Sequence, residues 1–218
     1  MTKSSLTHFI PQRILRYAPT DLCPLDGDIP VLQLLNTCRN RDTANTKNYI
    51  NTYEDFLTWC YEIRLIDQDT HNLLEIEGNC YVQEAAGIVN QVILAREMLY
   101  DLIYCLMSNE PVHHRVIEEF NTINIEANKH LRFEMTAYGL RKVWHNVDEE
   151  MAFPLWLIIK YAGDFLMSAD VQFIKKCHCG SFYLDKTKNR NRRYCNPLTC
   201  GSVRRSTKYY QRCFSVTG

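Results

Sequence analysis

Four cysteines near the C-terminal end of the chain have the spacing of metal ligands. Cys177 and Cys179 are separated by one residue, Cys195 and Cys200 by four, and fifteen residues lie between the two pairs. Each pair can bind one edge of an ion, and the intervening loop can bring the pairs together. Four thiolates in a tetrahedral array suit zinc, which imposes no geometry of its own. The spacing therefore predicts one structural zinc ion held by these four cysteines, with no open position for a catalytic water.

The sequence also allows other ligands and other kinds of site at these cysteines. His178 lies between the first two thiols and Cys213 follows the second pair, so each is an alternative to one of the four ligands. Free or disulfide-bonded thiols are a further alternative, but the chain shows no signal peptide, which favours a reducing, cytoplasmic location. An iron–sulfur cluster is less favoured, because cluster motifs usually space their cysteines more evenly. We therefore expect a cytoplasmic protein with a zinc site.

The charge of the chain is divided between its two parts. From residue 171 onward there are eleven Lys and Arg residues and a single acid, Asp185. The preceding residues carry 14 Lys and Arg against 24 Asp and Glu, so the formal net charge of zero hides a basic segment and an acidic remainder. Such an asymmetry predicts that the basic segment binds a polyanion.

The basic segment is a candidate nucleic-acid interface, with duplex DNA as the expected partner. Guanidinium groups bind phosphate and aromatic rings stack on bases, and a metal-bound scaffold favours binding over a merely solvated tail. From Ser202 the pattern predicts a short helix, with Val203, Tyr210 and Phe214 toward the zinc core and the basic residues outward. The predicted contacts are the basic residues around and after the second cysteine pair: Lys186, Lys188, Arg190, Arg192, Arg193, Arg204, Arg205 and Lys208.

Several short motifs in this stretch resemble a known family. Cys179-Gly180 is followed by Tyr183-Leu184-Asp185, by a basic, Asn-rich loop, by Arg-Arg-Tyr-Cys at 192–195 and by Cys-Gly at 200–201. These motifs resemble the CGNR-type zinc finger found at the C-terminus of bacterial ABATE-domain proteins, which are regarded as stress-linked transcription regulators. The Asn-Arg pair that gives the family its name is replaced here by Ser202-Val203, so no contact of that Arg is carried over.

The resemblance extends toward the N-terminus, to about residue 31. Matching segments are VLQLLNT at 31–37, EDFLTW at 54–59, AREMLY at 95–100 and the apolar run that ends in Ala162-Gly163. The resemblance implies a DNA-binding transcription regulator whose N-terminal domain senses a ligand or mediates dimerisation. It adds a homodimer partner and a small-molecule effector to the expectations, and it assigns no residue to effector binding.

Hydrophobic periodicity predicts a mainly α fold with one small β-hairpin. The predicted helices cover residues 52–66, 67–75, 81–107, 111–130 and about 148–166. Alternation on both sides of Gly139 predicts the hairpin, and the run 31–35 fits either a first helical turn or a short buried strand. The 218 residues suffice for one sizeable domain and a small module. We therefore divide the chain into a mostly helical N-terminal domain, 1–170, and a zinc-ribbon-like module, 171–218.

Arg96 is the one charged residue near the apolar stripe of the longest predicted helix. One interpretation is a buried structural arginine paired with an acid such as Glu62 or Asp101, and the other is a site for an anionic ligand. The first is favoured, because a buried arginine needs a partner whether or not a ligand binds.

The motifs of the chain favour a binding protein over an enzyme or a membrane protein. The chain contains no Gly-rich phosphate loop, nucleophile elbow or HExxH site, so we expect no enzymatic activity. It also contains no apolar run long enough to cross a bilayer, so we expect no membrane partner. Two alternatives to DNA binding use the same basic segment: an RNA- or ribosome-associated zinc-ribbon protein, and a protein-interaction adaptor.

Overall fold

The computed structural model describes residues 27–41, 44–145, 147 and 150–214, without the side chains of 208, 209 and 211–214. The N-terminal 26 residues of the predicted first domain lie outside this range. Most of the described chain is helical, and three small two-stranded sheets accompany the helices. The predicted fold class, mainly α with a small hairpin and a small C-terminal module, is confirmed.

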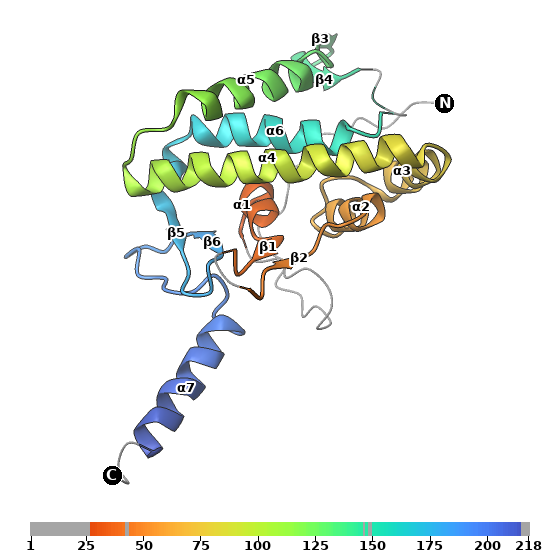
Figure 1. Ribbon diagram of the computed structural model, residues 1–218. Coiled ribbons are helices and arrows are strands. Elements are labelled where there is room, and N and C mark those ends of the chain that lie inside the picture. Colours follow the sequence, from red (N-terminus) through yellow and green to blue (C-terminus); the bar gives the residue numbers. More distant parts are fainter. Residues whose placement is uncertain (1–26, 42–43, 146, 148–149, 215–218) are drawn as a thin grey trace.

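The helical body is arranged around one long helix. Its helices are α1 (Pro30–Leu35), α2 (Tyr53–Glu62), α3 (Gln68–Cys80), α4 (Val82–Ser108), α5 (His114–Asn128) and α6 (Phe153–Leu166). Helices α5 and α6 lie along one side of α4, and α1 and α2 lie along the other side (Figure 1). Among the described residues, no helix combines the length and the apolarity needed to cross a bilayer.

The helix ends follow local signals in the sequence. Thr52 and Asp55 form a reciprocal capping box that starts α2, with the Asp55 amide donating to Thr52 Oγ1 at 3.0 Å. Helix α6 begins at Phe153, later than the predicted start near 148, so that start is wrong. Proline lacks an amide hydrogen and is tolerated in the first helical turn. Pro154 accordingly occupies that turn instead of the helix interior.

Helix α1 lies in the centre of the molecule. Val31, Leu32, Leu34 and Leu35 are at most 1% exposed, and the helix contacts α4, α6 and the C-terminal module. A helix that is apolar on all sides is stable only when it is surrounded. The structure thus decides between the two interpretations of this run in favour of a buried helix.

Three hairpins complete the fold. Strand β1 (Cys38–Arg39) pairs with β2 (Lys47–Asn48), β3 (Leu131–Thr136) with β4 (Gly139–Trp144), and β5 (Ile174–Lys176) with β6 (Phe182–Leu184). The second of these is the predicted hairpin, and Gly139 follows its turn with a φ of 113°. A short 3₁₀ helix, η1 (Ala169–Phe173), leads from α6 into β5. Strands of two or three residues are too short to show alternation, so β1, β2, β5 and β6 were not predicted.

Candidate metal centre and basic surface

The first cysteine pair lies in the turn between β5 and β6. The Cys177 amide donates to the Ser181 carbonyl at 2.8 Å, and the Gly180 amide donates to the Cys177 carbonyl at 2.9 Å. Gly180 has a φ of 88°, a conformation that glycine adopts without strain. This tight turn brings Cys177 and Cys179 to the same point.

The second cysteine pair lies at the start of the last helix, α7 (Cys200–Phe214). Asn196 shapes the approach, because its side-chain oxygen accepts from the Leu198 amide at 2.9 Å and its carbonyl accepts from the Gly201 amide at 3.1 Å. The turn places Cys195 and Cys200 beside the β5–β6 turn. Each pair thus comes from a turn whose backbone hydrogen bonds are local.

The four predicted thiol ligands come together in one cluster. Their sulfur atoms all lie within 4.8 Å of one another, and two distances, Cys177 Sγ to Cys200 Sγ and Cys179 Sγ to Cys195 Sγ, are 3.5 Å. Tetrahedral zinc with bonds of about 2.3 Å separates its sulfur ligands by about 3.8 Å. Disulfide sulfurs lie about 2 Å apart, so these distances fit a metal site and no disulfide.

The alternative ligands are less well placed, or lie outside the described atoms. His178 is exposed on the outside of the turn, whereas Cys177 is buried. The side chain of Cys213 is outside the described part of the chain. The donor set is therefore four cysteines positioned to hold one metal ion, consistent with one structural zinc.

The protonation of the thiols is uneven across the cluster. A hydrogen bond from Cys195 lowers the pKa of Cys179 to about 4, whereas burial raises the pKa of Cys200 to about 12. Thiols crowded in this way do not all ionise by themselves. A bound cation makes thiolates of its ligands, so this donor set has the chemistry that zinc requires.

Phe182 anchors the β5–β6 hairpin in the helical body. Its side chain is 1% exposed and belongs to the same hydrophobic core as α1, α4 and α6, together with Ile174 and Leu184. Its backbone amide donates to Asn36 Oδ1 at 2.8 Å, and its carbonyl accepts from Asn36 Nδ2 at 2.8 Å. The first half of the zinc module is thus packed into the body, so the two predicted domains share a core.

Asp185, the one acid of the basic segment, is buried and holds the following loop. Its carboxylate accepts from Lys175 Nζ at 2.6 Å, from the Thr187 hydroxyl at 2.6 Å and from the Arg192 amide at 3.1 Å. Burial by itself would raise the pKa of Asp185, but the hydrogen bonds from Lys175 and Thr187 outweigh it and lower the pKa to about 2. The carboxylate therefore stays ionised and closes the loop 186–191 at both ends.

Arg192 differs from the other predicted contacts because its donors are used inside the protein. Its Nη1 donates to both oxygens of Asp28, at 3.0 and 2.8 Å, and its Nε donates to the Tyr194 carbonyl at 2.9 Å. Its Nη2 donates to the Cys195 carbonyl, and its guanidinium lies over the Tyr183 ring. Through these contacts Arg192 links the second cysteine pair to Asp28 in the N-terminal part of the chain.

The other four basic residues of the loop are exposed, and two of them contact residues of η1. Lys186 pairs with Asp170 at 2.6 Å, and the Arg190 guanidinium lies 3.5 Å from the centre of the Phe173 ring. Lys188 and Arg193 are exposed. These four residues form a basic loop surface beside η1.

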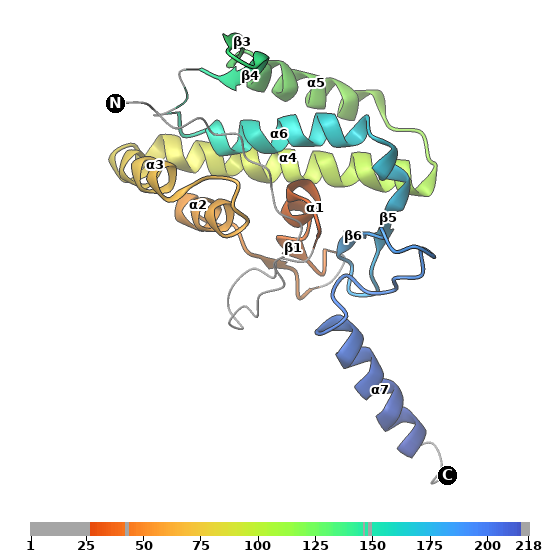
Figure 2. The same cartoon turned by 180° about the vertical axis from the view of Figure 1, so that it is seen from behind.

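Helix α7 points away from the body (Figures 1 and 2). Val203 and Tyr210 are 67% and 59% exposed, so their predicted orientation toward the zinc core is wrong. The first turn contacts the module, where Gly201 lies against the Tyr194 ring, and Arg205 Nη2 donates to the Pro197 carbonyl at 3.4 Å. Arg204 and Arg205 are exposed, and Arg205 donates to Ser202 Oγ at 2.9 Å. The side chains of Lys208 and Phe214 lie outside the described atoms.

Arg96 is a buried structural residue, as the favoured interpretation predicted. It is 3% exposed, and it donates to Glu97 at 2.8 Å and to Asn48 Oδ1 at 2.7 Å. The predicted acid partners, Glu62 and Asp101, are wrong. The side chain bends toward the β1–β2 hairpin, where Glu97 also pairs with Arg41.

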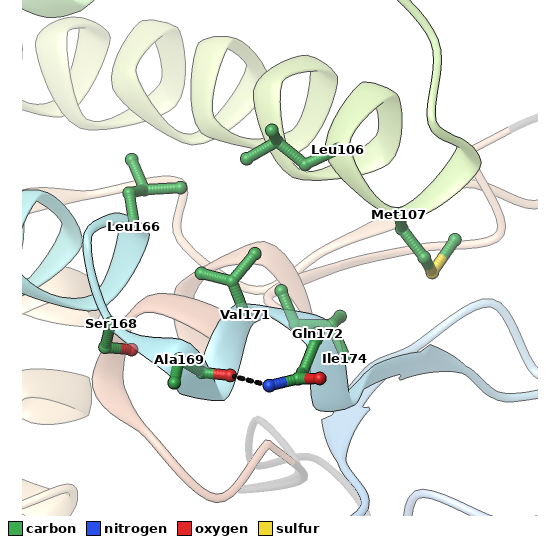
Figure 3. A pocket seen from close by; sticks show the side chains of 8 residues that line it. All are labelled: Leu106, Met107, Leu166, Ser168, Ala169, Val171, Gln172 and Ile174. Atoms are coloured by element: carbon green, nitrogen blue, oxygen red, sulfur yellow. Dashed lines mark hydrogen bonds between the residues drawn. The ribbon is translucent and has the colours of Figure 1, made fainter.

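A cavity of about 440 Å³ lies beneath η1, next to the start of β5 (Figure 3). Two polar side chains of its wall make hydrogen bonds within the wall: Gln172 Nε2 donates to the Ala169 carbonyl at 2.9 Å, and Ser168 Oγ donates to the Phe165 carbonyl at 2.7 Å. The apolar part of the wall is formed by Leu106, Met107, Leu166, Ala169, Val171 and Ile174. No motif in the sequence marked this cavity, because its wall combines the ends of two helices with η1.

Comparison with protein families identifies the C-terminal module. Residues 174–213 match the CGNR zinc finger model. This match covers the four clustered cysteines, the basic loop and nearly all of α7, so the metal centre is that of a CGNR zinc finger. No curated protein matches the chain.

Proposed function

We propose that this protein binds nucleic acid through its zinc finger, with duplex DNA as the main partner. The observation that carries the proposal is α7, a basic helix that projects from the four-cysteine metal site with Arg204 and Arg205 exposed. A helix of 15 residues is about 22 Å long, and the major groove of B-DNA admits an α-helix. The scaffold fixes the base of α7, which reduces the entropy lost when the helix docks.

The loop beside the helix supplies a second set of positive charges. Lys188 and Arg193 are exposed there, and Arg190 is held by Phe173. Such residues contact phosphates, which position a protein on the duplex, while a helix in the groove contacts base edges. We therefore assign phosphate binding to the loop and groove contacts to α7.

The resemblance to ABATE-domain regulators extends the proposal to transcriptional regulation in a bacterial stress response. In this proposal the helical body senses an effector or mediates dimerisation, and the chain has no enzymatic activity. The cavity beneath η1 is the place in the described body where an effector would act on the finger. Its wall includes Ile174, which begins β5 three residues before Cys177.

RNA is the second candidate partner. Tyr210 is 59% exposed on α7, and exposed aromatic side chains stack on unpaired bases in RNA-binding proteins. An exposed tyrosine among arginines therefore fits single-stranded or looped RNA as well as duplex DNA.

A competition experiment distinguishes the two partners. Zinc-loaded full-length protein is bound to labelled random duplex DNA at fixed salt, and unlabelled duplex DNA, structured RNA and single-stranded RNA are added as competitors. We expect duplex DNA to compete best. Stronger competition by either RNA would move the function to RNA, and the absence of binding to all three would favour a protein partner.

The basic residues of the body provide the control for this experiment. Arg115 is exposed on α5 and pairs with Glu119 at 2.7 Å. Arg115→Ala removes one exposed arginine outside the finger match, so its affinity should equal that of the wild type. An equal loss of affinity from Arg115→Ala and from Arg204→Ala would contradict the assignment of the interface to α7.

A further inference from the structure

The β3–β4 hairpin stands at the end of the molecule opposite α7 (Figures 1 and 2). Phe133, Met135 and Leu140 are 67%, 78% and 63% exposed, and Tyr138 in the turn is fully exposed. A lone two-stranded hairpin is at best marginally stable in water. Its exposed apolar side chains and open edges mark it as a candidate interaction surface, separate from the basic finger.

The register of the hairpin determines which backbone groups point outward. The His145 amide donates to the His130 carbonyl at 2.9 Å, so residues 130 and 145 form a hydrogen-bonded pair. Hydrogen-bonded and non-hydrogen-bonded pairs alternate along an antiparallel ladder. Leu131, Phe133 and Met135 therefore lie in non-hydrogen-bonded pairs with Trp144, Lys142 and Leu140. Their amides and carbonyls point away from β4.

This outward edge is open for most of its length. Within the described part of the chain, no hydrogen bond reaches the backbone amide of Phe133 or Met135. The Leu131 carbonyl accepts from Arg132 Nη1 at 2.9 Å, and the same nitrogen donates to the Lys129 carbonyl at 2.5 Å. The arginine side chain thus covers one end of the edge and would have to move when another strand pairs there.

We propose that β3 pairs with β3 of a second copy of this chain, antiparallel and centred on Phe133. In this register Phe133 lies opposite the partner's Phe133, and Leu131 lies opposite the partner's Met135. These are the residues with outward backbone groups, so the new ladder uses amides and carbonyls that β4 leaves unused. The two hairpins form one four-stranded sheet with a twofold axis, which closes the assembly at a dimer.

The charges support this register. Arg132 lies opposite the partner's Glu134, and by symmetry Glu134 lies opposite the partner's Arg132. Cross-strand pairs of opposite charge stabilise an antiparallel sheet, whereas like charges destabilise it. Glu134 already pairs with Arg141 at 3.2 Å, so the partner's Arg132 adds a second cation to that carboxylate.

The other edge of the hairpin is unsuited to the same pairing. The outward groups of β4 belong to Leu140, Lys142 and Trp144, so the equivalent register would place Lys142 opposite the partner's Lys142. An inward or central lysine is a common protection of an edge strand. The hairpin therefore presents one edge that is complementary to itself and one that repels its own copy.

The first test exchanges the two charges. Arg132→Glu alone and Glu134→Arg alone each place like charges opposite each other in the homodimer, whereas a mixture of the two variants restores two opposite-charge pairs. The edge is short, so we expect the wild type to dimerise with a micromolar Kd, measured by sedimentation over about 1–100 µM. We expect each single variant to have a dimer Kd about ten-fold higher than that of the wild type. The mixture should form a heterodimer at the same protein concentrations at which the wild type dimerises.

A second pair of variants tests the edge without relying on charge. Met135→Pro removes an outward amide that β4 does not use, so the hairpin keeps its own ladder and the dimer Kd should rise at least about ten-fold. Lys142→Pro makes the matched change on the opposite edge and should leave the Kd unchanged. Far-ultraviolet circular dichroism confirms that both variants are folded.

Each contrary outcome overturns the proposal. A wild type that stays monomeric over the whole range does so, as does a dimer that is indifferent to the charge exchange, because packing of the two apolar faces would give that result. Equal effects of Met135→Pro and Lys142→Pro would also overturn it. The finger lies at the other end of the molecule, so a failure here leaves the proposed binding of nucleic acid intact.

Discussion

The two halves of the zinc finger relate to the body in opposite ways. The half with Cys177 and Cys179 is packed into the core through Phe182, which is 1% exposed. The half with Cys195 and Cys200 leads into α7, whose Val203 is 67% exposed. The metal site joins an anchored hairpin to a projecting helix, so it transmits the rigidity of the body to the basic surface.

This difference explains why an isolated zinc module would be a poor description of the finger. The hairpin lies in the core of the body and α7 lies outside it, although both belong to one family match of 40 residues, 174–213. Substitutions in the anchored half should therefore change stability, and substitutions of exposed side chains on α7 should change binding alone.

The largest effect should come from removing a ligand that links the halves. Cys195→Ser should abolish binding of one zinc per chain and lower the melting temperature of the entire protein, because the β5–β6 hairpin shares the core of the body. Zinc content and thermal unfolding followed at the helical signal provide the measurement. Cys80→Ser, at an exposed cysteine of α3, is the matched control. Full zinc content in Cys195→Ser would show that another residue is the ligand.

The next effect concerns the anchor itself. Phe182→Ala removes a fully buried ring, which should lower the free energy of unfolding by about 3–5 kcal/mol. Val203→Ala truncates an exposed apolar residue of α7 and should change it by less than about 0.5 kcal/mol. Urea unfolding of the zinc-loaded variants measures both values. Comparable losses in the two variants would remove the distinction between anchored and projecting halves.

A smaller effect is expected at the polar contact that fixes the hairpin. Asn36→Ala leaves the amide and the carbonyl of Phe182 without their partner in a buried position, which should cost about 2–3 kcal/mol. Asn189→Ala, in the exposed loop of the finger, should have little effect. An unfolding free energy within about 0.5 kcal/mol of the wild type for Asn36→Ala would show that water replaces the amide.

The body should respond to alkaline pH through Tyr53. Burial, with a smaller contribution from Cys60, raises the pKa of its hydroxyl above the usual value of 10.0, and the hydroxyl donates to the Met151 carbonyl at 2.9 Å. A group with a raised folded-state pKa contributes stability that is present below its unfolded pKa, near 10, and is lost above it.

Tyr53→Phe isolates this contribution. The variant should be less stable than the wild type by about 1 kcal/mol at pH 8, and the difference should shrink as the pH rises above about 10. Urea midpoints of both proteins between pH 8 and pH 11 provide the measurement. A difference that stays constant over this range would mean that Tyr53 ionises equally in the folded and unfolded chains.

Local features of this protein could be predicted from its sequence, and distant contacts could not. The cysteine spacing indicated the metal ligands, and alternation around Gly139 indicated the β3–β4 hairpin. Arg192 and Arg193 are adjacent residues of the same type. Only the fold shows that Arg192 donates hydrogen bonds to Asp28, which lies 164 positions earlier in the sequence. The contact between Asn36 and Phe182 spans 146 positions. Nothing local distinguishes such residues from exposed ones.

The orientation of α7 shows the same limit from the opposite side. The spacing of Val203 and Tyr210 indicated a helix with an apolar side, and the helix is present. Periodicity reports that a side exists, but it cannot report whether the chain supplies something to cover it. For α7 the described body supplies no cover, since both residues are more than half exposed.

The most direct test of the central claim is the salt dependence of duplex DNA binding by the wild type and by the double variant Arg204→Ala/Arg205→Ala. The two residues lie in the projecting half, so the double variant should keep its zinc and its melting temperature. Its affinity should fall, and the slope of log affinity against log salt should decrease by about two. An unchanged slope and affinity, with the zinc still bound, would contradict the assignment of nucleic-acid binding to α7.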